Sequence, residues 1–169
     1  MNTADLLLDA FGRVRETVHT TVGGLSADLL NARPDKDANS IAWLVWHLTR
    51  VQDDHVADAA GTGQVWTGED WAGRFDLPLP PEATGYGHSS KEVGQVRVAS
   101  ADLLLGYHDA VHARTTAFVR GLGDDALDRI VDEAWSPPVT LGVRLISVIA
   151  DDLQHVGQAA YVRGALERR

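Results

Sequence analysis

Hydrophobic residues recur every three or four positions in four long stretches of the chain, with polar residues between them. This spacing is typical of α-helices that turn one apolar face toward a core. The stretches cover residues 3–22, 41–60, 103–120 and 145–166. Amphipathic helices of this number and length predict an all-α fold, a four-helix bundle, and we expect residues 1–169 to form one domain.

The connections between these helices differ in length. Residues 61–98 lack periodicity and contain prolines, glycines and two tryptophans; so long a connection is usually functional or crosses the length of a molecule. Residues 25–30 have the pattern of a helical turn, and Asp124 is a candidate cap for a short helix ending near Ile130. Residues 135–140 hold two prolines and should be non-helical. No pattern of alternating polarity competes with these helices, so no strand is predicted.

Composition narrows the classes of function. The 15 basic and 24 acidic residues leave a formal net charge of −9, and an acidic chain is unlike nucleic-acid-binding proteins, which carry a basic surface. The chain has no cysteine, which excludes disulfides, thiolate metal ligands and a cysteine nucleophile. No apolar run reaches the roughly 20 residues of a membrane span, and the first residues do not read as a signal peptide. We therefore expect a cytoplasmic protein that contacts neither membranes nor nucleic acids.

The fourth helix carries polar residues inside its apolar face. Asp152 and His155 project into that face and Asp151 lies at its edge, so carboxylate and imidazole stand side by side one turn apart. With a third ligand from another helix, such a pair can hold a divalent metal. His47 and His55 of the second helix are both candidates for that ligand. The same spacing also suits a purely structural interpretation, in which histidine and aspartate hydrogen-bond across the core or the acids face solvent.

Other polar and aromatic residues give weaker indications of a functional site. His108 and His112 are four residues apart on the third helix, but they project onto its polar side, and we expect them to face solvent. Trp66 and Trp71 lie in the irregular connection and are candidates for the wall of a ligand cavity. The chain has no phosphate loop, dinucleotide-binding fingerprint, Gly-x-Ser-x-Gly turn or HExxH motif. Hydride transfer, ATP use and serine-hydrolase chemistry therefore have no support in the sequence.

Several segments resemble the DinB/YfiT-like superfamily of metal-binding four-helix bundles. The broad likeness rests on Trp46-His47-Leu48 and on residues 151–158, Asp-Asp-Leu-Gln-His-Val-Gly-Gln. Five segments in order resemble more narrowly the actinobacterial branch that contains mycothiol S-transferases, related to mycothiol-dependent maleylpyruvate isomerases. They are residues 39–44 (Asn-Ser-Ile-Ala-Trp-Leu), 50–53 (Arg-Val-Gln-Asp), 84–88 (Thr-Gly-Tyr-Gly-His), 137–140 (Pro-Pro-Val-Thr) and 154–161 (Gln-His-Val-Gly-Gln-Ala-Ala-Tyr).

The resemblance implies a divalent metal held by His47, Asp151 and His155. Many relatives have histidine at the position of Asp151, so the site here would contain two histidines and one carboxylate. Zinc is the first choice on ligand type, and nickel, manganese and iron are compatible. Asp152 would then support the ligands or pair with a residue such as His55. The resemblance also implies an up-down-down-up helix order, in which a long crossover between the second and third helices is expected.

The function implied by the resemblance is that of a metal-dependent thiol S-transferase, which would join mycothiol as cosubstrate to a small electrophile in detoxification or a stress response. Arg50, Gln158 and Tyr86 are candidate contacts to the cosubstrate, and His88 could close over the same cavity with Tyr86. The alternatives are a metal-dependent hydrolase or isomerase on the same bundle, and a non-catalytic metal-binding stress protein. A homodimer formed through a helix face is a further expectation.

Overall fold

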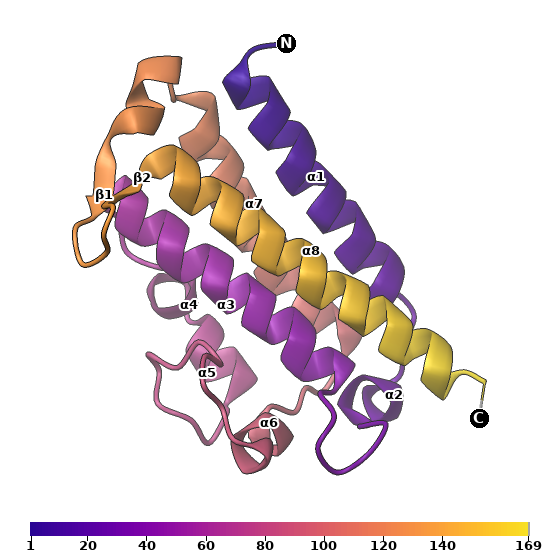
Figure 1. Ribbon diagram of the computed structural model, residues 1–169. Coiled ribbons are helices and arrows are strands. Elements are labelled where there is room, and N and C mark those ends of the chain that lie inside the picture. The colour runs from indigo at the N-terminus through magenta and orange to yellow at the C-terminus, as the bar shows by residue number, and fades with distance from the viewer. Residues whose placement is uncertain (169) are drawn as a thin grey trace.

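Four long helices pack side by side in the computed structural model, which describes residues 1–168 (Figure 1). They are α1 (Thr3–Val22), α3 (Ile41–Ala60), α7 (Ala101–Arg120) and α8 (Leu141–Leu166). α8 packs against α3 and α1, and α7 packs against the same two helices from the other side. α1 and α8 run in one direction and α3 and α7 in the other, so the predicted four-helix bundle with up-down-down-up order is confirmed. Within the described part of the chain, no helix combines the length and the apolar character that crossing a membrane requires.

Local capping explains where the long helices begin and end. The Ser40 side chain accepts a hydrogen bond from the backbone N–H of Trp43, and Gly61 ends α3 in the left-handed conformation at φ +66°. α7 and α8 start at Ala101 and Leu141, a few residues earlier than the sequence predicts. Ser100 and Thr140 cap them, and each side chain accepts a hydrogen bond from a backbone N–H of the first turn.

The long crossover between α3 and α7 contains three short helices. They are α4 (Val65–Gly68), α5 (Trp71–Phe75) and α6 (Ser90–Gln95), and a further short helix, α2 (Ala27–Asn31), follows α1. Helices of four to six residues are too short to show a periodic pattern, which is why the sequence did not predict those of the crossover. Trp66 is 3% exposed and packs against Phe75 and Tyr107, so it belongs to the hydrophobic core.

A small hairpin corrects the prediction that the chain has no strands. β1 (Ile130–Asp132) pairs antiparallel with β2 (Val139–Thr140) just before α8, and the 3₁₀ helix η1 (Asp124–Asp128) precedes it. Strands of three and two residues cannot show alternating polarity, so this hairpin left no signal in the sequence. Arg129 ties it to α3 by donating to the carbonyl of Ala59 at 2.7 Å.

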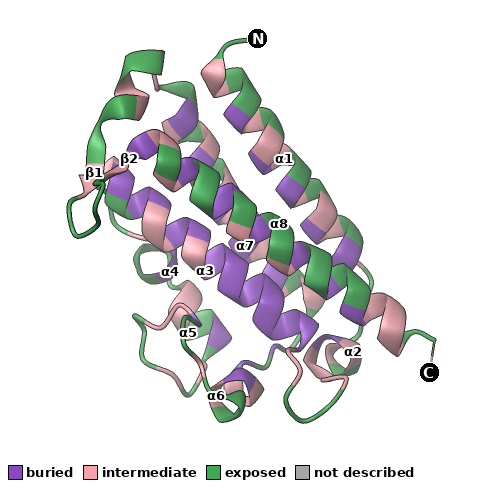
Figure 2. Cartoon of the chain, viewed as in Figure 1, coloured by how far each residue is buried: buried purple, intermediate pink, exposed green. Residues whose placement is uncertain are grey.

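His108 corrects a second prediction, because its side chain is fully buried instead of facing solvent. α7 packs on both α1 and α3, so its buried face is wider than a single apolar stripe (Figure 2). The Thr49 hydroxyl donates to a backbone carbonyl and lies 3.2 Å from His108 Nδ1, which therefore donates to it. Nε2 of His108 is buried and has no hydrogen-bond partner among the described residues. Burial lowers the pKa of His108 to about 3, so the ring is neutral at physiological pH.

This buried imidazole predicts a loss of stability in acid. Between the ordinary histidine pKa of 6.5 and the folded value of about 3, the unfolded chain binds a proton that the folded chain does not. The free energy of unfolding should therefore fall as the pH falls through this window, and His108 should contribute about 1.4 kcal/mol per pH unit at most. Urea titrations at several pH values should give a shallower acid slope for His108→Leu than for wild type. Equal slopes would contradict the assignment. His112 is only partly exposed and burial lowers its pKa too, so His112→Leu should also make the slope shallower, but less than His108→Leu does.

Candidate metal centre

Three potential metal ligands converge where α3 meets α8. His47 comes from α3, and Asp151 and His155 come from successive turns of α8. One ligand atom from each lies within 4.8 Å of the others. His47 is buried, whereas the Asp151 and His155 side chains are 33% and 20% exposed. The structure thus brings together the three residues that the resemblance implies.

Hydrogen bonds orient both imidazoles in the same way. His47 Nδ1 lies 2.5 Å from the carbonyl oxygen of Thr84, and His155 Nδ1 lies 3.0 Å from Oε1 of Gln158. Since a carbonyl oxygen can only accept, each Nδ1 carries the proton and each Nε2 keeps a free lone pair. Metal-binding histidines commonly have this arrangement, in which the outer hydrogen bond fixes tautomer and ring orientation.

Asp151 supplies the negative charge among the three potential ligands. Its Oδ1 lies 3.5 Å from Nε2 of His155, and its Oδ2 is buried with no hydrogen-bond partner among the described residues. A buried carboxylate oxygen without a partner is costly, and a cation bound between the three side chains would satisfy it. Two imidazole nitrogens and one carboxylate suit zinc, nickel, manganese or iron. The residues present therefore fit a divalent metal.

The two histidines have opposite pKa shifts. Burial lowers the pKa of His47, so this ring is neutral and available as a ligand at physiological pH. When Nε2 of His155 is protonated it can donate to Asp151, and this raises the pKa of His155, because the carboxylate favours the charged imidazolium. Protons therefore compete with a metal mainly at His155.

Trp43 packs against the ligands and was not predicted as part of the site. Its ring stacks on His47 at a centroid distance of 4.6 Å and meets His155 edge-on at 6.2 Å. Its indole N–H donates to Nδ1 of His88 at 3.2 Å, which fixes His88 behind the ligands. Trp43 precedes His47 by one helical turn, and this spacing is the only sequence signal of the contact.

Gly85 lies so close to His47 that a larger residue would displace the ring. A Cβ atom at Gly85 would be 2.5 Å from His47 Nδ1, and its φ of +94° is unfavourable for other residues. Gly85→Ala should therefore weaken metal binding by about 10–100-fold, the usual effect of disturbing a contact that orients a metal ligand. Gly87→Ala is the matched control, since Gly87 also has a positive φ but no atom within 4 Å of an added Cβ. Metal titration of both variants measures the difference, and equal affinities would contradict this role of Gly85.

A cavity of about 540 Å³ opens beside the ligands, and His47 and Asp151 form part of its wall. The other lining residues come from α3, the crossover, the hairpin region and α8: Val51, Asp54, His55, Thr84, Tyr86, Asp132, Trp135, Arg144, Ser147 and Val148. Tyr86 and Trp135 are 92% and 67% exposed, so they stand at the mouth of the cavity. The cavity thus combines a charged wall, apolar patches and two aromatic rings at its opening.

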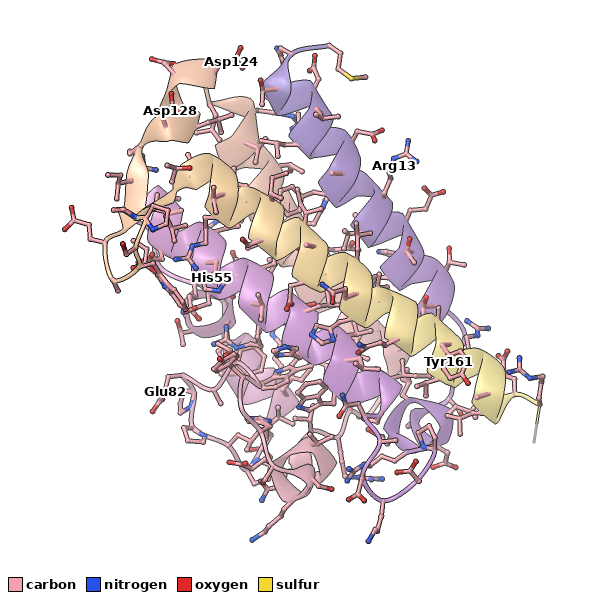
Figure 3. All side chains as sticks on the ribbon, viewed as in Figure 1. Arg13, His55, Glu82, Asp124, Asp128 and Tyr161 are labelled. Atoms are coloured by element: carbon pink, nitrogen blue, oxygen red, sulfur yellow. The ribbon has the colours of Figure 1, made fainter. Side chains whose placement is uncertain are left out.

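Ionic contacts fix the wall formed by His55, Asp132 and Arg144. The Arg144 guanidinium donates to Asp132 Oδ2 at 2.7 Å and to Nδ1 of His55 at 3.1 Å. Because arginine can only donate, His55 Nδ1 accepts and its Nε2 carries the hydrogen. Burial and the Arg144 charge lower the pKa of His55, which is therefore neutral. His55 lies on α3, as Figure 3 shows, and is not among the three converging ligands.

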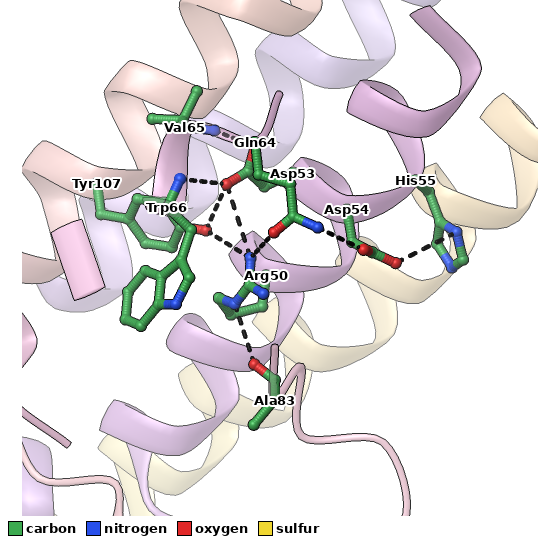
Figure 4. Close-up of polar contacts among 9 residues, drawn as sticks. All are labelled: Arg50, Asp53, Asp54, His55, Gln64, Val65, Trp66, Ala83 and Tyr107. Carbon is green, nitrogen blue, oxygen red and sulfur yellow. Dashed lines mark hydrogen bonds and ion pairs between the residues drawn. The ribbon is translucent and has the colours of Figure 1, made fainter. Parts of the chain in front are cut away.

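The residues predicted to contact a cosubstrate have different places in the structure. Tyr86 lines the cavity, and Gln158 holds His155. Arg50 is not brought to the cavity. Its side chain is 0% exposed and donates to the carbonyl of Ala83 and to Gln64 (Figure 4). Arg50 lies on the same helix as His47, one turn further along. Its long side chain, however, carries the guanidinium away from the cavity and under the crossover.

Asp152 does not make the pairing with His55 that the sequence analysis considered. The carboxyl group is fully buried, and neither oxygen has a hydrogen-bond partner among the described residues. Burial, together with the charge of Asp151, raises the pKa of Asp152 well above its ordinary value, so the group is held neutral.

Comparisons with known proteins agree with this architecture. A family model of the DinB superfamily matches residues 10–159, a range that contains all three ligands. The chain is also similar to a conserved protein from Enterococcus faecalis, known from a crystal structure, with 31% identity and a TM-score of 0.90. That similarity covers 96% of both chains. No curated protein matches the sequence.

Proposed function

The chain belongs to the DinB superfamily, and from the site that it builds on this bundle we propose that the protein is a divalent-metal-dependent thiol S-transferase. The reaction joins a low-molecular-weight thiol, mycothiol in this proposal, to a small electrophile. The observation that carries the proposal is the opening of His47 and Asp151 onto a cavity of about 540 Å³. Three protein ligands leave room for a substrate atom, as in catalytic zinc sites, whereas structural sites are closed by four.

The chemistry requires a sulfur nucleophile that the chain does not contain. A bound divalent metal would lower the pKa of an incoming thiol, so that the thiolate is available at neutral pH. Because the sequence has no cysteine, the sulfur must arrive with the cosubstrate. In the transfer, sulfur forms a bond to the electrophilic carbon, the leaving group departs with its electron pair, and the thiol proton passes to water. The five segments that resemble mycothiol S-transferases support mycothiol as the thiol.

The residues of the cavity have separate roles in this proposal. Tyr86 and Trp135 would contact the less polar parts of the substrates at the mouth. His55 would present its Nε2–H as a hydrogen-bond donor, because Arg144 already occupies its Nδ1. Arg144 itself is held by Asp132, so it contributes a fixed positive charge. Zinc remains the first choice of metal, with nickel, manganese and iron as the others to be tested.

The test is an assay of the metal-loaded protein with and without thiol. Purified protein loaded with each metal is incubated with monobromobimane or 1-chloro-2,4-dinitrobenzene and with mycothiol, N-acetylcysteine or no thiol. These electrophiles also react with free thiols without protein, so the rate in buffer is subtracted. We expect the protein to accelerate formation of the thioether, identified by mass spectrometry, only when metal and thiol are both present, and most with mycothiol. Turnover of ester or amide substrates by water alone would replace the proposal with a hydrolase. Absence of any turnover in protein with a full complement of metal would favour a non-catalytic binding protein.

A further inference from the structure

The cavity beside the ligands runs along the seam between α3 and α8. His47 and His55 line it from α3 and are eight residues apart, and Asp151 and Arg144 line it from α8 and are seven residues apart. At a rise of about 1.5 Å per residue, these spacings correspond to about 10–12 Å along the seam. Arg144 contacts His55 across the seam at 3.1 Å, so these two residues lie together, remote from the potential metal ligands. We call this part of the cavity its far end.

Asp54 and His55 offer a hydrogen-bond acceptor and a donor side by side at the far end (Figure 4). Asp54 Oδ2 lies 4.0 Å from His55 Nδ1, which already accepts from Arg144 and has no hydrogen to donate. Asp54 Oδ1 accepts from Gln64 at 2.6 Å, whereas no described residue donates to Oδ2. His55 Nε2 keeps its hydrogen in the same way. The two side chains are 40% and 36% exposed, so a ligand in the cavity can reach both atoms.

The charges at the far end favour an uncharged ligand. Asp54 and Asp132 line it together with Arg144, and Asp132 balances Arg144 through a contact of 2.7 Å. The Asp54 carboxylate therefore repels a ligand that ends in a carboxylate or a phosphate. An ammonium group would satisfy Asp54 but would bring a second donor against the His55 N–H. A hydroxyl group satisfies both side chains, because it accepts from His55 and donates to Asp54.

We propose that Asp54 and His55 bind the hydroxyl groups of a sugar or polyol whose attached thiol reaches His47 and Asp151 at the other end of the cavity. This inference rests on the proposed transferase function and assigns it one class of cosubstrate, an uncharged polyhydroxylated thiol. Trp135 is 67% exposed at the mouth, where its ring is available to the C–H groups of a sugar. Mycothiol belongs to this class, because a spacer separates its sulfur from its sugar hydroxyls. Glutathione, which ends in carboxylates, does not.

Binding without turnover tests the far end directly. S-methylmycothiol keeps the sugars but has no free thiol, and isothermal titration calorimetry measures its affinity for the metal-loaded protein. Asp54→Asn should weaken binding by about 10-fold or more, because Gln64 holds Oδ1 and the new amide nitrogen replaces the acceptor with a donor. His55→Ala removes the donor and should have a similar effect. Asp58→Asn is the matched control, since Asp58 is an exposed acid one turn further along α3 that does not line the cavity. A wild type that does not bind S-methylmycothiol, or equal affinities in all four proteins, would overturn the proposal.

The transfer assay separates this inference from the transferase function itself. The ratio of kcat/KM for mycothiol to kcat/KM for N-acetylcysteamine, a thiol with neither sugar nor charge, should fall about 10-fold in Asp54→Asn and His55→Ala. The preference of wild type for mycothiol over glutathione should also shrink in Asp54→Asn, because the repelling charge is gone. Transfer with unchanged ratios in these variants would refute the far-end site and leave the transferase function in place. Weaker binding of S-methylmycothiol by the variants of a protein without transferase activity would support the far-end site and refute the function.

Discussion

Purified wild-type protein is expected to bind about one divalent metal ion per chain, and His155→Ala is expected to lose it. The variant keeps His47 and Asp151, but two ligands do not hold a transition metal as three do. Loss of a residue that only hydrogen-bonds to a ligand weakens metal binding about 10–100-fold. Loss of a ligand itself should have a larger effect, so we expect the affinity for the metal to fall by more than about 100-fold, or roughly 3 kcal/mol. Mass spectrometry of metal content after chelator-free purification, followed by competitive titration, measures the change.

Two variants separate the ligand set from the rest of the cavity. Asp151→Ala should lose the metal as His155→Ala does, because it removes the carboxylate whose Oδ2 finds no hydrogen-bond partner within residues 1–168. His55→Ala is the matched control, since His55 lines the same cavity but does not converge with the three ligands. We expect it to retain the metal. Equal metal content in all the variants, or loss in His55→Ala alone, would rule out the proposed ligand set.

The part of this site that the sequence predicts is the part set by helical periodicity. Asp151 and His155 lie four residues apart on one helix, and this spacing alone brings their side chains together. The choice of His47 instead of His55 needed the resemblance, because both lie on α3 and periodicity does not tell which one faces α8. The same reasoning predicts the four long helices, each of which has a continuous apolar stripe.

Contacts between distant segments could not be predicted in this way. Thr84 holds His47 across 37 residues of sequence, and Gly85 touches the same ring, but the crossover that carries them has no periodicity. Arg144 and Asp132 reach the cavity only because the hairpin folds back beside α8. The burial of His108 likewise depends on which helices flank α7. Each of these features is determined by tertiary packing, which leaves no local pattern in the chain.

Replacing Asp53 of α3 with alanine should strongly destabilise the fold, because its carboxylate holds the beginning of the crossover. Asp53 is 3% exposed, and its carboxylate accepts hydrogen bonds from the backbone N–H groups of Val65 and Trp66 and from the hydroxyl of Tyr107, at 2.8–2.9 Å (Figure 4). Its Oδ2 also lies 3.7 Å from the guanidinium of Arg50, which is fully buried. Asp53→Ala leaves this charge without a counterion, and such a loss typically costs about 3–5 kcal/mol. Urea denaturation followed by circular dichroism measures the free energy of unfolding.

Two further variants show whether the unpaired charge of Arg50 causes the loss of stability in Asp53→Ala. Tyr107→Phe removes the hydrogen bond to the carboxylate and the longer one from Arg50 at 3.4 Å but leaves the ion pair, so it should cost only about 1–2 kcal/mol. Arg50→Met/Asp53→Ala removes both charges, and it should be less destabilised than the sum of its two single changes. Additive effects, or an Asp53→Ala cost no larger than that of Tyr107→Phe, would show that the pair is not coupled. Because Arg50 also donates to Ala83, directly before Thr84, loosening this network should reach the loop that orients His47.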